Sequence, residues 1–172
     1  EIYSLKLLTD LIEYLKHVNT KIEFNIHLKL DTGMHRLGFV EVEIEKILHL
    51  LSTCPEIKVI SVFSHLASSE NPADDIFTRN QISLFNKMSS KIIDKLGYPV
   101  MRHILNSTGI IRFPEARYEM VRLGLGLYGI DNSGVLEDKL ENIGTFKTTV
   151  SQLKLVNKGD TVGYGRKNIL AK

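Results

Sequence analysis

The chain has 172 residues, of which 43% are hydrophobic and 24% charged, and its formal net charge at pH 7 is +2. The 22 basic and 20 acidic residues are intermixed, so the charge pattern gives no argument for binding nucleic acid or an anionic membrane. No apolar run approaches the roughly 18 residues of a membrane span. The single cysteine, Cys54, excludes an internal disulfide and suits a reducing cytoplasm.

Periodic apolar residues predict alternating helices and strands. Behind Ser4, a candidate N-cap, four of them recur at helical spacing: Leu5, Leu8, Ile12 and Leu15. In 22–31, IEFNIHLKLD, apolar and polar residues alternate strictly, which predicts a strand with one polar face. The further predicted elements are a helix over 44–51, a strand over 57–65, a helix over 75–96, and strands over 99–107 and 119–129. The chain opens inside a helical pattern without an initiator Met, so we expect it to be a fragment.

The order of these elements predicts the fold class. Regular alternation of helix and strand favours a parallel sheet with short crossovers. Polar or glycine-rich residues follow the strands, and in a (β/α)8 barrel the carboxyl ends of the strands form the ligand face. A complete barrel takes about 250 residues, so we predict an α/β fold in which residues 1–138 form part of a (β/α)8 TIM barrel.

The sequence changes character after Gly129. Residues 131–142 are polar and turn-prone, which is typical of a linker. Residues 145–167 are rich in Thr and Val and show apolar–polar alternation, broken at 157–159, which predicts antiparallel β structure. We therefore predict that residues 139–172 begin a β-rich second domain.

The stretch 28–39, LKLDTGMHRLGF, concentrates charge where a strand ends. Lys29 is either paired with a nearby carboxylate at the surface or buried in a barrel, where it would need a partner or a modification. Gly33 and Gly38 permit a tight backbone around Arg36. The planar guanidinium of Arg36 suits a carboxylate or a phenolate oxygen.

Four more positions combine a structural and a functional interpretation. His65 follows a buried strand, where a lone histidine is more often a satisfied core residue than a catalytic one. The six histidines show no HxH or HExxH spacing, so no metal site is predicted. Asn106–Ser107 is a helix N-cap that could also receive a phosphate. Arg122 faces either a helix or the barrel lumen, and Tyr164 between two glycines is usually a packing residue.

Taken together, five segments point to one family. KLDTGMHRLGF, FSHLASSE, LNSTG, VRLGLGLYG and VGYGR, in this order and at these separations, resemble the alanine racemases that depend on pyridoxal 5'-phosphate (PLP). The resemblance implies an N-terminal (β/α)8 barrel, a β-rich C-terminal domain and a head-to-tail homodimer in the cytoplasm. It also implies that the parent protein interconverts L- and D-alanine for peptidoglycan precursors.

The resemblance implies roles for single residues. Lys29 matches a lysine that is often carbamylated and holds Arg36, and Arg36 matches the arginine that contacts the phenolic oxygen of PLP and the substrate carboxylate. Arg122 matches the arginine that donates to the pyridine nitrogen. His65 matches the histidine between that arginine and Tyr164, which is one of two catalytic bases and reaches into the partner subunit's site.

The phosphate of PLP is implied to bind at Asn106, Ser107, Gly124 and Leu125. Two departures from the family pattern stand beside this match. No segment resembles the N-terminal motif whose lysine holds PLP covalently, so we expect the 172 residues alone to be inactive. His35 replaces a usual glycine, which affects the placement of Arg36.

Two other functions fit the same sequence. One is a non-catalytic PLP-binding barrel protein, and the other is a racemase-like domain fused to another enzyme. Such PLP-binding proteins generally end after the barrel, so the β segment with Tyr164 favours the racemase.

Overall fold

The computed structural model describes residues 1–18, 22–136 and 138–171. Position 137 of the predicted linker and residue 172 of the predicted second domain lie outside them. Three strands form a parallel sheet in the order β1-β2-β3: β1 (Phe24–Lys29), β2 (Ile57–Phe63) and β3 (Met101–His103). The parallel sheet and the alternation with helices confirm the predicted partial barrel.

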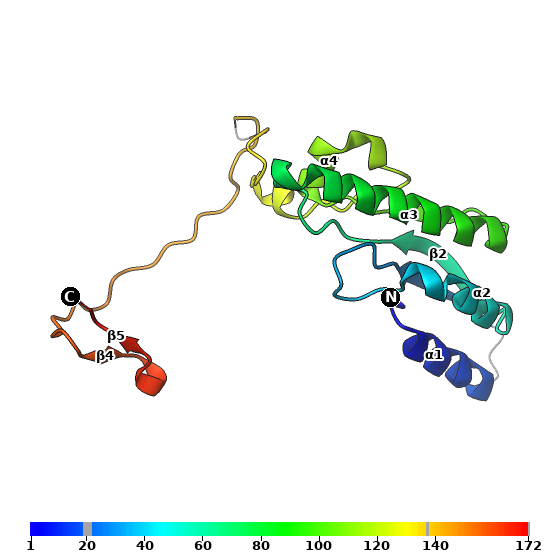
Figure 1. Cartoon of the computed structure of the whole chain (residues 1–172), viewed down its shortest axis with the longest axis horizontal. Helices are drawn as coiled ribbons and strands as arrows, with labels where there is room; N and C mark the ends of the chain where they lie inside the picture. Colours follow the sequence, from blue (N-terminus) through cyan, green and yellow to red (C-terminus); the bar gives the residue numbers. More distant parts are fainter. Residues whose placement is uncertain (19–21, 137, 172) are drawn as a thin grey trace.

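Three amphipathic helices cover one face of the sheet. They are α1 (Leu5–Val18), α2 (Ile44–Ser52) and α3 (Asp75–Leu96); α1 contacts α2, and α2 contacts α3 (Figure 1). Leu7 N–H donates to Ser4 Oγ over 3.3 Å, which confirms the predicted cap of α1. The helix α3 ends at Gly97, whose φ of 72° is the left-handed conformation that commonly ends a helix.

The core lies between this face of the sheet and the helices. Ile26 and Leu28 of β1 and Val59 and Val62 of β2 are buried, and they meet the buried faces of the helices. The contributing residues of the helices include Leu8, Ile12, Ile44, Ile47, Phe85, Met88 and Ile92. Removing this apolar surface from water is the main stabilising contribution to the barrel segment.

A β-bulge gives the opposite face of the sheet its polar lining. Ile26 pairs with Val59 but the next residue, His27, pairs with Ser61, so Ile60 is the extra residue of β2. Paired residues of parallel strands share a face. Ser61 therefore lies on the same face as His27. Two residues further along the strands, Lys29, Phe63 and His103 lie on that face as well.

The predicted strand over 119–129 is wrong. Met120 N–H donates to Arg102 O and Arg122 N–H to Leu105 O, at 3.3 and 3.0 Å, so the segment does run beside β3. Side chains replace the other ladder partners, because Arg102 N–H donates to the Glu119 carboxylate over 2.8 Å. The glycine-rich stretch then forms a 3-10 turn, η4 (Leu125–Tyr128).

The remaining elements are short. Before and after β3 lie η1 (Glu41–Glu43), η2 (Pro72–Asp74), α4 (Ser107–Arg112) and η3 (Pro114–Ala116). Near the C-terminus lie β4 (Thr161–Val162), η5 (Tyr164–Arg166) and β5 (Asn168–Ile169). None of the helices in the described part of the chain is long and apolar enough to span a membrane.

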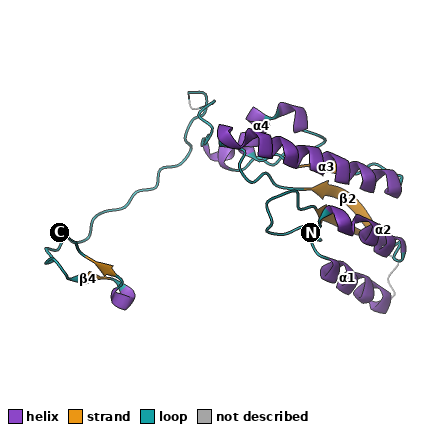
Figure 2. Cartoon of the chain, viewed as in Figure 1, coloured by secondary structure: helices purple, strands orange, loops and turns teal. Residues whose placement is uncertain are grey.

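The antiparallel structure predicted over 145–167 is present only at its end. β4 and β5 pair antiparallel, whereas residues 145–157 form no strand and run away from the helices and the sheet (Figures 1 and 2). Their apolar side chains are exposed: Phe146 is 99% and Leu155 105% exposed. A strand in water needs a paired neighbour and a face to bury, and this segment has neither within the described residues.

Candidate active site

A cavity of about 360 Å³ opens at the carboxyl ends of β2 and β3. Five of the residues predicted for catalysis or cofactor binding line it: His65, Asn106, Ser107, Gly124 and Leu125. A larger hollow of about 450 Å³ lies beside the second half of α3 and contains none of the predicted residues. The sequence therefore located one shared cavity from three separate segments.

The Ser107 hydroxyl organises one wall of this cavity. Ser107 Oγ accepts the N–H groups of Gly124 and Gly126 over 2.8 and 3.1 Å, which fixes the glycine-rich turn against the start of α4. Asn106 caps α4, because its Oδ1 accepts Gly109 N–H over 2.9 Å. Ser107 and Leu125 both line the cavity, and neither the hydroxyl proton of Ser107 nor the N–H of Leu125 donates a hydrogen bond among the described residues.

Arg122 lies across the ends of β2 and β3. Its Nη1 donates to Nδ1 of His103 and to His103 O, and its Nη2 donates to Ser64 O over 2.6 Å and to His65 Nδ1 over 3.2 Å. Burial lowers the pKa of the guanidinium from its ordinary value. Nε–H takes part in none of these bonds, so one donor of a firmly held cation is left for an acceptor.

His103 is a site residue that the sequence did not reveal. Arginine can only donate, so Nδ1 of His103 accepts and Nε2 carries the proton. That Nε2–H donates to Ser61 Oγ over 3.2 Å, and the Ser61 hydroxyl then donates to His27 Nδ1 over 2.6 Å. Burial, together with Arg122 and His27, lowers the pKa of His103 to about 4, so the ring is neutral at pH 7.

His65 is held in the same tautomer. Its Nδ1 accepts from Arg122, which leaves Nε2–H as a donor beside the cavity. Burial and the positive charges of Arg122, Arg36 and Lys29 lower the pKa of His65 below its ordinary value. A neutral His65 can therefore connect Arg122 to a hydroxyl group that binds in the cavity.

The turn that carries Arg36 is built on the Asp31 carboxylate. Asp31 Oδ1 accepts the N–H groups of Gly33 and His35, each over 3.0 Å. Burial opposes ionisation of Asp31, but these N–H groups and the His35 ring outweigh it and hold the pKa of Asp31 below its ordinary value. His35 has a φ of 54°, the left-handed conformation for which glycine is favoured. Arg36 itself is exposed.

Lys29 combines the two interpretations that the sequence left open. Its side chain is only 13% exposed, and its Nζ lies 3.0 Å from Oε1 of Glu1 and 5.3 Å from the centre of the Phe63 ring. A buried lysine thus does have a carboxylate partner. The carbamylation implied by the family resemblance stays a prediction.

Tyr164 does not line the cavity. It begins η5 next to β4, in the segment that Figure 1 shows apart from the sheet, and its side chain is fully exposed. A role in a partner subunit's site stays a prediction, because it concerns a second chain.

Fold and cavity together define a class: a parallel α/β barrel segment with a cavity at the carboxyl ends of its strands. Residues 2–132 match the family described as "Alanine racemase, N-terminal domain". The match covers most of the chain, so the chain belongs to this family.

Individual relatives agree with that assignment. The chain is 36% identical over 141 residues to an alanine racemase of Sorangium cellulosum, which covers 81% of this chain and 37% of the relative. An alanine racemase structure from Clostridium difficile superposes with a TM-score of 0.71 at 30% identity, over 98% of this chain and 44% of that one. The chain thus spans less than half the length of these relatives.

A third structure bears on the fold alone. The alanine racemase of Bartonella henselae, described with covalently bound pyridoxal phosphate, matches 99% of this chain and 45% of its own at 22% identity and a TM-score of 0.70. The shared fold includes the segment beyond the family match.

Proposed function

We propose that the whole protein to which this chain belongs is a PLP-dependent alanine racemase that interconverts L- and D-alanine for peptidoglycan precursors. The observation that carries this proposal is the common cavity of His65, Asn106, Ser107, Gly124 and Leu125, with Arg122 bound directly behind His65. The proposed protein is a cytoplasmic homodimer, as the family resemblance implies.

The donors around the cavity fit PLP. The Ser107 hydroxyl and the Leu125 N–H are available to phosphate oxygens, and Nε–H of Arg122 is available to the pyridine nitrogen. Because a guanidinium does not give up its proton at neutral pH, Arg122 would donate a hydrogen bond without protonating that nitrogen. Bound PLP supplies an electron sink for the carbanion formed at the substrate α-carbon.

The chain's own residues would bind the substrate and move the proton. Arg36 would hold the substrate carboxylate, since its exposed guanidinium can donate two parallel hydrogen bonds to the carboxylate oxygens. Tyr164, reaching the partner subunit's site, would take or return the α-proton on one face, and the base on the other face would come from outside these 172 residues. His65 would orient the hydroxyl of Tyr164 of the partner subunit through Nε2–H, while Arg122 fixes the His65 ring.

Replacing Tyr164 by Phe in the holoenzyme tests this proposal. We expect racemisation in at least one direction to fall on the order of 100-fold or more, because a positioned base is lost, with the PLP absorbance unchanged. Tyr14→Phe is the matched control, because Tyr14 is an exposed tyrosine on α1. Unchanged racemisation by Tyr164→Phe would contradict the role of Tyr164 as a catalytic base. A wild-type holoenzyme that does not racemise alanine would contradict the proposed activity itself.

We also propose that Lys29 carries a carbamate in the holoenzyme, since a carbamate anion could hold the Arg36 guanidinium. After exchange with ¹³C-bicarbonate, a carbamate ¹³C signal should appear in the wild type and be absent from Lys29→Gln. The competing state is the ammonium of Lys29 bound to Glu1. A wild type without the carbamate signal supports that ion pair instead.

A further inference from the structure

Gln81 on α3 binds the loop that carries His65. Its Nε2–H donates to His65 O over 3.3 Å, and its Oε1 accepts Ala67 N–H over 3.0 Å. The Gln81 side chain is buried, with 1% exposure, so both ends of its amide depend on this loop for partners. One side chain thus fixes the peptide groups on both sides of Leu66.

Gln81 also packs beneath the turn that precedes Arg36. A Cβ built on Gly33 would lie 3.4 Å from Cγ and 3.5 Å from Nε2 of Gln81. Phe77 is nearer still, with Cζ at 3.2 Å, so the turn lies over Phe77 and over the same Gln81 side chain that holds the His65 loop. Two segments of the site share one support.

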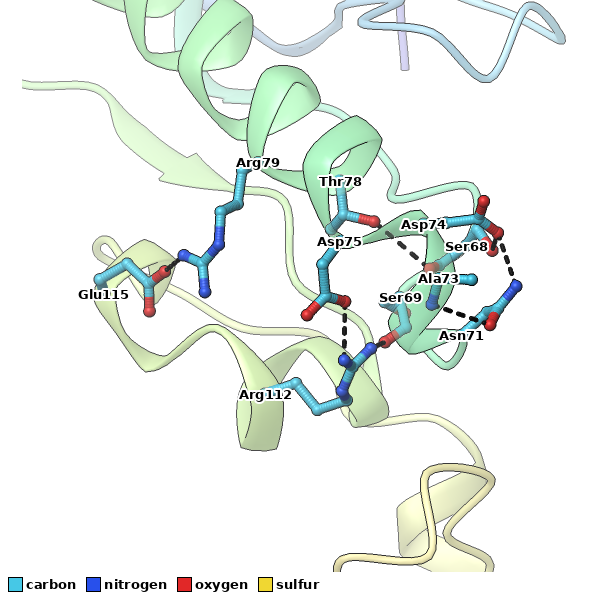
Figure 3. A network of polar contacts seen from close by, with 10 residues as sticks. All are labelled: Ser68, Ser69, Asn71, Ala73, Asp74, Asp75, Thr78, Arg79, Arg112 and Glu115. Atoms are coloured by element: carbon cyan, nitrogen blue, oxygen red, sulfur yellow. Dashed lines mark hydrogen bonds and ion pairs between the residues drawn. The ribbon is translucent and has the colours of Figure 1, made fainter.

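The rest of the loop is anchored from two helices. Thr78 Oγ1 donates to Ser68 O over 3.3 Å, and Arg112 of α4 donates to Ser69 O over 2.6 Å (Figure 3). Arg112 also donates to Asp75 Oδ1 over 2.6 Å, so α4 is tied to the start of α3. With the far end held in this way, Gln81 supplies the hydrogen bonds from α3 to the other end of the loop, at His65 and Ala67.

We propose that Gln81 is a positioning residue for His65. By holding the His65 carbonyl and the Ala67 N–H, it keeps His65 Nδ1 within hydrogen-bond reach of Arg122 Nη2, 3.2 Å away. Loss of the Gln81 amide would remove the hydrogen-bond partner of two partly buried peptide groups, His65 O and Ala67 N–H. The loop would then shift to find other partners, and His65 would leave Arg122. The consequence for racemisation rests on the proposed function, whereas the placement of His65 does not.

The test is Gln81→Met in the full chain, which preserves side-chain length and removes both hydrogen bonds. In ¹⁵N spectra of the histidine rings at neutral pH, the wild type should show His65 as the single tautomer protonated at Nε2. In Gln81→Met, the His65 signals should move toward a mixture of tautomers. The His103 signals should stay in place, because His103 is held by Arg122 and Ser61 rather than by Gln81.

Asn80→Met is the matched control, because Asn80 precedes Gln81 on α3 and is exposed; its His65 spectrum should equal that of the wild type. Gln81→Leu serves if Gln81→Met does not fold, since it also removes both hydrogen bonds and is suited to a buried position. Wild-type His65 signals in a folded Gln81→Met, or in Gln81→Leu if that is the folded variant, would overturn the positioning role whatever the activity.

In the holoenzyme we expect Gln81→Met to lower kcat on the order of tenfold to a hundredfold with little change in KM for alanine, as for a displaced active-site group. If the His65 signals change but the wild type does not racemise alanine, the positioning role stands and the proposed function fails. If the wild type racemises alanine and Gln81→Met leaves the His65 signals unchanged, the reverse holds.

Discussion

Two segments of the chain that were both predicted as β structure differ in what they form: β1 alternates strictly, and 145–157 alternates only in part. In β1, Ile26 and Leu28 are 2% and 0% exposed, because the strand pairs with β2 and its apolar face packs against helices. In the segment 145–157, Phe146 and Leu155 are fully exposed and no strand forms. Alternation therefore indicates which face a strand would bury, but a strand forms only where a neighbour and a covering layer exist.

The sheet and helices between Ile2 and Ala116 should be sensitive to the addition of a single carbon at Gly38. Gly38 has a φ of 128°, and a Cβ there would lie 2.6 Å from Asp31 N and 2.7 Å from Leu30 C. Those backbone atoms belong to the bridge in which Asp31 N–H donates to Phe39 O. We expect Gly38→Ala to lower the free energy of unfolding by about 3 kcal/mol, measured by urea denaturation.

Gly97→Ala separates the clash from the conformational strain. Gly97 also has a positive φ, 72°, but a Cβ there would meet no atom within 4 Å. Its cost should be about 1 kcal/mol, the strain of a left-handed residue alone. Equal losses for Gly38→Ala and Gly97→Ala would show that the close approach at Gly38 is not rigid.

Much of the barrel segment could be predicted from sequence, because its patterns are local. Helical spacing located α1, α2 and α3, and the polar clusters at strand ends located the cavity. The bulge at Ile60 could not be predicted, since IKVISVF shows a nearly continuous apolar run. That bulge places Ser61 on the polar face of the sheet. The hydrogen bonds that join His27, Ser61 and His103 could therefore not be predicted from the sequence. The one sign of this site in the sequence was His103 itself, a histidine within the strand predicted over 99–107.

In the segment after β3, the local pattern predicted a strand that does not form. VRLGLGLYG has the apolar alternation of a strand, and its glycines were the only sign against one. The hydroxyl of Ser107 binds Gly124 N–H and Gly126 N–H and bends the segment into η4. A tertiary contact of a serine 17 residues earlier is not readable from the local pattern.

His103 should make the stability of the barrel segment depend on pH. Its pKa is about 4 in the folded protein and ordinarily 6.5, so the unfolded chain binds a proton below pH 6.5 that the folded chain does not. Stability from this group is complete above pH 6.5 and is lost as pH falls toward 4. Between pH 7 and 5 we expect about 2 kcal/mol of loss, measured by urea denaturation at both values.

His103→Gln identifies the source of that loss. The variant is less stable at pH 7, because Arg122 and Ser61 lose a partner, but its decrease between pH 7 and 5 should be smaller by the same amount. His49→Gln, at an exposed position on α2, should keep the full decrease. A decrease in His103→Gln as large as in the wild type would assign it to other groups.

The smallest effect is expected from removing the C-terminal segment, and its size depends on where the cut falls. All buried hydrophobic residues of the described chain lie between Ile2 and Ala116, so residues 143–172 add nothing to that core. Leu140, however, lines a small hollow with Ile110 and Ile111, and Glu141 O lies 1.9 Å from where a Cβ of Gly129 would be. The predicted boundary after 138 therefore cuts through contacts with the barrel segment.

A chain of residues 1–142 should unfold within about 0.5 kcal/mol of the full chain and with the same denaturant slope. A chain of residues 1–138 should lose about 1 kcal/mol, because Leu140 no longer covers apolar surface. A large loss for 1–142 would mean that the exposed alternating segment does find a face to cover, and the two regions would then form one cooperative unit.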